Sequence, residues 1–221
     1  MTYMPISANV QGRLFKYMQV SHLKETIETQ TLSLRPPAKW DDHNDSFGIE
    51  HYKTITNMKS VYVSCMTMSS ETHHHWNMFA KNDGVCICIN RQKLEEHLKN
   101  KEGLSFGEVN YLRIKEIPKH LENRADRLPF IKRINFADER EYRVVFATDK
   151  YVPVDKSCGY PIEFRSELIS GIKFSPDACE AKITEFKGWL SRYDSCTHIT
   201  ASKSRLTDSI RWQNQIKAAF G

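Results

Sequence analysis

The residues best suited to chemistry lie in the segment EREYR at positions 139–143, where a polar stretch enters an apolar strand. Alternate side chains of a strand share a face, so Glu139, Glu141 and Arg143 are predicted to lie together if the strand extends back that far. Two carboxylates beside a guanidinium can orient a ribose hydroxyl and stabilise a developing cationic sugar, as paired carboxylates do in glycosyl transfer. A surface ion-pair ladder, which is common, is the alternative.

A second group of interest is the histidine run at positions 73–75. Adjacent side chains point in different directions on a helix or a strand, so three in a row cannot all bind one ion. Metal sites usually space their ligands by two to four residues, and no such spacing occurs nearby. We therefore predict no metal site and expect a solvated loop, and the sequence leaves open whether this run has any role.

The acidic segment 41–45 reads as a polar loop that ends near Gly48. Its neighbours Trp40 and Phe47 are apolar and could anchor the loop against the body, which would make it a ligand rim. A simple cluster of turn residues is the alternative. Familiar local motifs do not occur: the chain has no GxGxxG, P-loop, GxSxG or HExxH sequence.

Composition indicates an ordinary globular protein of 221 residues, 40% hydrophobic and 27% charged, with a net charge of +5. That size and pattern predict a single domain over 1–221, with a core at about 13–180 and a C-terminal helical part at about 175–221. No apolar run approaches the ~20 residues that a bilayer requires, so no membrane association is expected. The start MTYMPISANV does not resemble a secretory signal. We expect a cytoplasmic protein with six reduced cysteines, and the oligomeric state stays open.

The elements that must position these groups follow from periodicity and turn residues, and their order indicates an α+β fold. A short helical segment is expected at 76–80, and the charged stretch 115–135 is expected to be helical in its middle. Longer helices are predicted at 21–29 with Ser21 as N-cap, at 91–99, from Ser175 to about residue 193, and at 207–219. Strands are predicted at 13–19, 30–35, 60–66, 84–90, 107–114, 141–147, 170–174 and 198–202.

Several of these segments resemble the uncharacterised bacterial family DUF2971 over roughly residues 14–180. They are LFKYMQ, VYVSCM, HWNMFA, GVCICIN, FADEREYRVVF and LISGIKFSPDA. The chain departs from the family pattern at Met78, where the family usually has His, at Phe79 in place of Tyr, and at Phe136 in place of Trp.

The order of that family is in turn similar to the ADP-ribosyltransferase superfamily, which implies split, mainly antiparallel sheets flanked by helices. The resemblance implies an NAD-consuming transferase with Glu141 as catalytic carboxylate and Glu139 as its partner. NAD would be the substrate, and the acceptor would be an unknown protein or nucleic acid. Such proteins commonly serve as toxins or phage-defence effectors, some with an antitoxin. The NAD-binding residues implied are Lys16 or Tyr17 on the first strand, Arg35, Ser64, Trp76 and Arg143.

Whether Lys16, Arg35 and Arg143 gather around one cleft stays open: if they do, the net charge of +5 marks a local phosphate site, and if they scatter, it is a surface property. The main alternative is a non-catalytic or nucleic-acid-acting protein that grips phosphates through the mixed-charge segment 113–133. A metal-dependent hydrolase is the third hypothesis.

Overall fold

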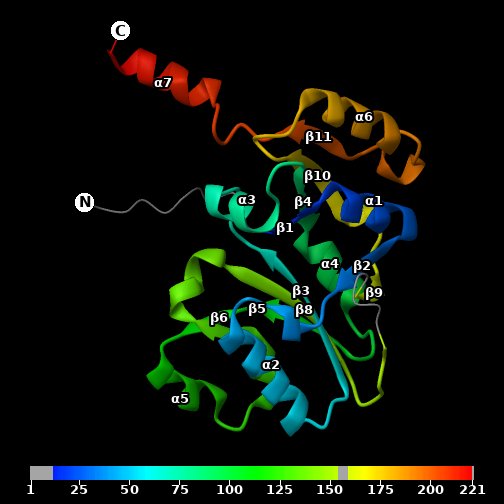
Figure 1. The fold of residues 1–221 in the computed structure, drawn as a ribbon, viewed down its shortest axis with the longest axis vertical. Coiled ribbons are helices and arrows are strands. Elements are labelled where there is room, and N and C mark those ends of the chain that lie inside the picture. Colours follow the sequence, from blue (N-terminus) through cyan, green and yellow to red (C-terminus); the bar gives the residue numbers. More distant parts are fainter. Residues whose placement is uncertain (1–11, 154–158, 221) are drawn as a thin grey trace.

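Seven strands form the main sheet, in the order β11-β10-β4-β1-β3-β8-β5 (Figure 1). This computed structural model describes residues 12–153 and 159–220. All neighbouring strands in the sheet are antiparallel except the parallel pair β10 and β11. The strands are β1 (Arg13–Gln19), β3 (Ser60–Thr67), β4 (Gly84–Asn90), β5 (Leu104–Glu108), β8 (Glu141–Thr148), β10 (Ile169–Phe174) and β11 (Thr200–Lys203).

The sheet divides into two parts between β1 and β3. Strand β1 pairs with β4 along its whole length, and β3 does the same with β8. Within the described residues, β1 and β3 meet only at the pair Phe15–Thr67. Two small sheets lie outside the main one: β2 (Thr31–Leu34) with β9 (Tyr160–Glu163), and β6 (Asn110–Leu112) with β7 (Ile131–Arg133).

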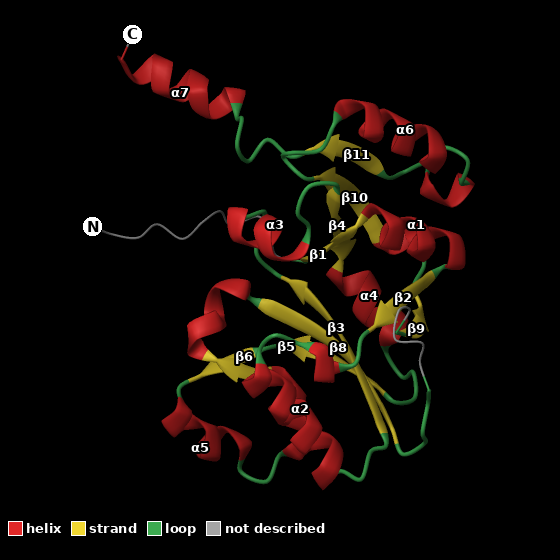
Figure 2. Ribbon diagram, viewed as in Figure 1, coloured by secondary structure: helices red, strands yellow, loops and turns green. Residues whose placement is uncertain are grey.

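Helices surround both parts of the sheet (Figure 2). Helices α1, α3 and α6 contact strands of the part that holds β1 and β4, whereas α2 contacts β3. The expected α+β class, with a mainly antiparallel sheet and flanking helices, is confirmed. The helices are α1 (Val20–Thr29), α2 (His43–Ile55), α3 (His73–Phe79), α4 (Arg91–Leu98), α5 (Ile117–Leu121), α6 (Glu180–Leu190) and α7 (Ile210–Phe220).

Helix α2 was not predicted, but its local sequence explains why it forms. Asp42 is its N-cap and accepts hydrogen bonds from the backbone N–H groups of Asn44 and Asp45. An Asp at this position satisfies N–H groups that no helical carbonyl can reach. The prediction of a loop up to Gly48 was therefore wrong, since the polar segment is the capped first turns of a helix.

Other boundaries also differ from the predictions. The predicted strand 107–114 is two strands, because β5 ends at Glu108 and β6 then pairs with β7 in a separate sheet. Helix α6 begins at Glu180, since the Ser175 hydroxyl accepts from the N–H of Asp177 in a preceding turn. Gln19, not Ser21, stands at the N-cap of α1.

The main core lies between the sheet and the helices, with Leu14, Ile87 and Val144 among its fully buried side chains. A smaller cluster of Trp76, Ala80 and Cys86 fastens α3 to the sheet. Helix α7 extends away from the body (Figure 1). In the part of the chain that the structure describes, no helix is long and apolar enough to span a bilayer. The cysteines described there are free thiols, while Cys158 and the N-terminal MTYMPISANV segment lie outside the described residues.

Candidate functional site

A cavity of about 670 Å³ opens where β1 and β3 diverge. Its volume lies in the usual range of small-molecule sites, roughly 300–1,000 Å³. Six of the eight residues predicted from the sequence line it, whereas Trp76 and Arg143 do not. The six are Lys16, Tyr17, Arg35, Ser64, Glu139 and Glu141.

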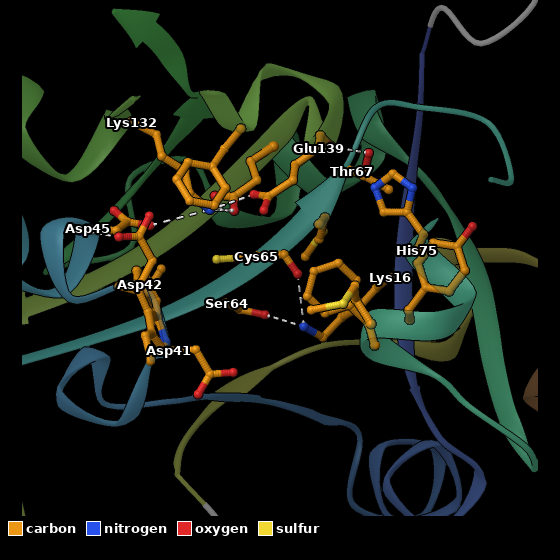
Figure 3. A pocket seen from close by; sticks show the side chains of 18 of the residues that line it. Lys16, Asp41, Asp42, Asp45, Ser64, Cys65, Thr67, His75, Lys132 and Glu139 are labelled. Carbon is orange, nitrogen blue, oxygen red and sulfur yellow. Dashed lines mark hydrogen bonds and ion pairs between the residues drawn. The ribbon is translucent and has the colours of Figure 1, made fainter. Parts of the chain in front are cut away.

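The carboxylate pair at one end of the cavity is held together by Lys132 of β7. The Lys132 ammonium donates to Glu139 Oε2 at 2.5 Å and to Glu141 Oε1 at 3.0 Å. Arg143 Nε donates to the other oxygen of Glu141, Oε2, at 2.6 Å. Figure 3 shows Lys132, Glu139 and Asp45 grouped on the same side of the cavity. The charged residues therefore form a buried ionic cluster and not the surface ion-pair ladder that was the alternative.

Backbone geometry brings Glu139 to Glu141 by a route other than strand alternation. Strand β8 begins at Glu141, and Glu139 ends the preceding 3₁₀ segment Ile134–Glu139. Arg140 between them is left-handed, with φ of 44°. The predicted shared face holds for Glu141 and Arg143, but the extension of the strand back to Glu139 was wrong.

The two carboxyl groups have different pKa values. Burial and the neighbouring Glu141 carboxylate raise the pKa of Glu139 to about 7, although Lys132 opposes the rise. For Glu141, burial also opposes ionisation, but Arg143 and Lys132 outweigh it and lower the pKa to about 2. Two carboxyls whose environments displace their pKa values in opposite directions are suited to different roles in one reaction.

Arg143 lies beneath the cavity, fully buried. It donates to both carboxylate oxygens of Asp45, at 2.9 and 2.5 Å, and to the Pro129 carbonyl at 3.0 Å. Its guanidinium lies 5.2 Å from the Trp40 ring centroid. Arg143, predicted as an NAD-binding residue, therefore does not join Lys16 and Arg35 in the cavity wall, because its donors serve carboxylates and a carbonyl inside the protein.

On the opposite wall, Lys16 links the two parts of the sheet. Its ammonium donates to Ser64 Oγ at 2.8 Å and to the Cys65 carbonyl at 3.1 Å. Burial lowers the pKa of Lys16, and Arg35 adds to that effect. The backbone of Arg35 is fixed by two hydrogen bonds with Val63, of 2.8 and 2.9 Å. A second cavity of about 550 Å³ also has Lys16, Tyr17 and Arg35 in its wall, so the two cavities adjoin at these residues.

Trp76 supports the cavity wall from behind. Its ring meets Tyr17 edge-on, with the ring centroids 5.0 Å apart, and its indole N–H donates to Glu71 at 3.0 Å. Only 3% of Trp76 is exposed. The structure therefore places Tyr17, and not Trp76, where a ring could be bound.

The histidine run forms the first turn of α3, so the expected solvated loop was wrong. Thr72 is the N-cap and accepts the N–H of His75 at 3.1 Å. His73 and His74 are exposed, but His75 is buried. Among the described residues, no group of three His, Cys, Asp or Glu side chains is placed to hold a metal ion.

The acidic segment contributes to the site in part. Asp41, Asp42 and Asp45 all line the cavity, and Trp40 is half-buried beside them. Burial raises the pKa of Asp45, although Arg143 opposes the rise. Phe47 is 70% exposed, so its predicted role as an anchor was wrong.

Sequence reasoning missed Lys132 and His75. Lys132 stands in a charged stretch with no strand signal, and only the pairing of β7 with β6 gives it a fixed place. For His75, the Thr72 capping signal was the available clue, because a helix that starts there gives the three histidines different environments.

Comparison with known proteins covers one segment. Residues 75–144 match the model of a family described as Protein of unknown function (DUF2971). The match supports the predicted DUF2971 resemblance over that segment, which runs from α3 through the carboxylate pair into β8. No curated protein and no solved structure matches the chain.

Proposed function

We propose that the protein binds NAD between β1 and β3 and transfers the ADP-ribose group to an acceptor. The observation that carries the proposal is the pair Glu139 and Glu141, with oppositely displaced pKa values, at one end of a cavity of nucleotide size. The sheet that separates between β1 and β3 supports the predicted ADP-ribosyltransferase-like fold as part of this proposal.

The two adjoining cavities suit a dinucleotide. Lys16 and Arg35 stand in the wall that both cavities share, so a ligand that reaches from one to the other passes them. A pyrophosphate is the negatively charged bridge of a dinucleotide, and cationic side chains bind phosphate oxygens through charge-assisted hydrogen bonds. In this placement the nicotinamide riboside lies beside the carboxylate pair, and the adenosine lies toward the second cavity.

Glu141 suits the stabilising role. Its low pKa keeps it ionised at neutral pH, and each carboxylate oxygen keeps a further lone pair beyond its bond to Lys132 or Arg143. The C1′–N bond breaks, the bonding electrons leave with neutral nicotinamide, and the ribose becomes an oxocarbenium ion. The Glu141 carboxylate accepts a ribose hydroxyl and stabilises that cation.

Glu139 suits the acid–base role. A carboxyl with a pKa of about 7 is partly ionised at neutral pH and can accept a proton. The acceptor nucleophile forms a bond to C1′ and gives its proton to Glu139, which returns it to solvent. The products are the ADP-ribosylated acceptor, nicotinamide and one proton. An enzyme of this kind would act as a toxin or defence effector, with an antitoxin as a fitting partner.

Several basic residues of 113–133 are already paired inside the protein, which leaves less support for the nucleic-acid alternative. Lys132 is enclosed by carboxylates, Arg124 binds Asp126 at 2.9 and 2.8 Å, and Arg127 donates to the His120 carbonyl. These contacts offset the positive charge that would otherwise attract phosphate groups.

The test uses NAD labelled in its adenine ring, incubated with the protein and a cell extract as acceptor. We expect label to enter the extract and Glu139→Gln to reduce that transfer about 100-fold. Glu96→Gln, on the exposed face of α4, is the matched control and should transfer normally. If wild-type protein neither labels any extract nor releases nicotinamide, the proposal is wrong. Steeply salt-dependent binding to RNA or DNA in the same preparation would then favour the alternative.

A further inference from the structure

Three polar atoms on residues of the cavity wall are buried without a hydrogen-bond partner among the described residues: Tyr17 Oη, Asp42 Oδ2 and His75 Nε2. His75 has no role in the scheme above. Only 2% of His75 is exposed, and Nε2 has no hydrogen-bond partner among the described residues. The other ring nitrogen, Nδ1, lies 2.5 Å from Thr72 Oγ1. A buried polar atom without a partner costs about 1–3 kcal/mol, so such atoms call for an explanation.

The imidazole is held firmly in place. Its ring is stacked on Tyr17 with a centroid distance of 5.3 Å and an interplanar angle of 15°, and Phe79 packs against it at 6.0 Å. Thr72 fixes both its backbone N–H and its Nδ1. In either tautomer, Nε2 retains one hydrogen-bonding function, as donor or as acceptor. His75 is therefore an oriented group that presents one unused function.

The place of His75 in the cavity indicates what it could bind. His75 lines the cavity, and Figure 3 shows it beside Thr67 at the same end as Glu139. Burial lowers the pKa of His75, although the nearby backbone carbonyl of Glu139 opposes the shift, so the ring is mainly uncharged at neutral pH. An uncharged imidazole suits an uncharged partner, whereas Lys16 and Arg35 in the shared wall suit phosphate.

We infer that His75 is a substrate-binding residue whose Nε2 forms a hydrogen bond with an uncharged polar group next to the bond that breaks. The inference rests on the proposed function and deepens it. In NAD, two groups flank that bond and have this chemistry: the carboxamide of nicotinamide and the hydroxyls of the adjoining ribose. Both can donate and accept, so the tautomer of His75 adapts to either.

Calorimetry with two fragments of the substrate tests the inference and distinguishes these sources. Nicotinamide carries the carboxamide, and ADP-ribose carries the ribose hydroxyls. We expect His75→Phe to weaken the binding of one fragment about tenfold and to leave the other unchanged, which identifies the group. His75→Gln, which restores a polar amide, should recover part of the loss. His75→Leu is a smaller apolar replacement in case the phenyl ring does not fit.

His73→Phe is the matched control, because His73 is the exposed neighbour on the same helix and does not line the cavity. If His75→Phe and His75→Leu bind both fragments as wild type does, while wild type consumes NAD, the inference is wrong and the proposed function stands. If wild type binds neither fragment and does not consume NAD, the proposed function itself fails.

Discussion

Replacing Arg143 with Met tests whether the buried ion cluster holds Glu141 in its charged form. Arg143 is fully buried and makes hydrogen bonds to Asp45, Glu141 and the Pro129 carbonyl. Without it, three carboxylates remain with Lys132 as their nearby cation. Removing one partner of a buried ion pair typically costs 3–5 kcal/mol, because it leaves charge uncompensated away from water. We therefore expect Arg143→Met to lower the free energy of unfolding by about 3–5 kcal/mol at pH 8.

The loss should depend on pH. Arg143 is a main cause of the low pKa of Glu141, so removing it raises that pKa toward or above the ordinary value of 4.5. When a native carboxyl has a raised pKa, the folded state binds more protons than the unfolded state, and stability falls as pH rises. The difference between wild type and Arg143→Met should therefore be smaller at pH 5 than at pH 8.

Urea unfolding followed by circular dichroism measures both effects. Arg165→Met is the matched control: Arg165 is 63% exposed and binds Glu163 at the surface, so its loss should cost less than about 1 kcal/mol. If Arg143→Met is no more destabilising than Arg165→Met, the cluster does not hold charge as we describe. A difference that grows toward pH 5 would refute the sign of the pH dependence.

Two further changes test the site and its support. Glu139→Gln should flatten the pH dependence of stability between about pH 4.5 and 7, since a pKa raised to about 7 makes wild type lose stability across that window; equal slopes of unfolding free energy against pH in the two proteins would contradict this. Gly84→Ala should destabilise by about 1–3 kcal/mol, because its Cβ would overlap the backbone carbonyl of Ala80 at the end of α3. Thermal unfolding checks it, and Gly48→Ala, where a Cβ meets nothing within 4 Å, is the control.

Most central strands could be predicted because β-branched, aromatic and other apolar residues recur along the whole element, and β1 could be predicted from its aromatic residues. β1, β3, β4 and β8 lie where the patterns placed them, and Tyr142 and Val144 share one face of β8 in the main core while Val145 packs in a second cluster on the other face. Their side chains are buried by neighbouring strands, so local preference and tertiary packing agree. Helix α2 was missed because its first turns are polar, and a cap such as Asp42 is also typical of a turn.

The site could be predicted in its composition but not in its connections. Glu139 and Glu141 could be paired because they are neighbours in sequence, whereas Lys132, whose ammonium joins them, comes from β7. Arg143 was expected to bind NAD in the cavity, but its guanidinium forms a buried ion pair with Asp45 of α2. Such pairings depend on how distant elements pack, and no spacing along the chain encodes them.

Release of nicotinamide from NAD by wild type and by Glu141→Gln tests the central claim most directly. The Gln amide keeps the shape of the side chain and removes the negative charge of the Glu141 carboxylate, which Arg143 and Lys132 keep ionised. We expect release by wild type and a loss of at least ~100-fold in Glu141→Gln, with NAD binding close to that of wild type. The variant should still fold, with a lower unfolding midpoint, because Arg143 keeps Asp45 and Lys132 keeps Glu139 as partners. Equal rates of release in the two proteins would contradict the account.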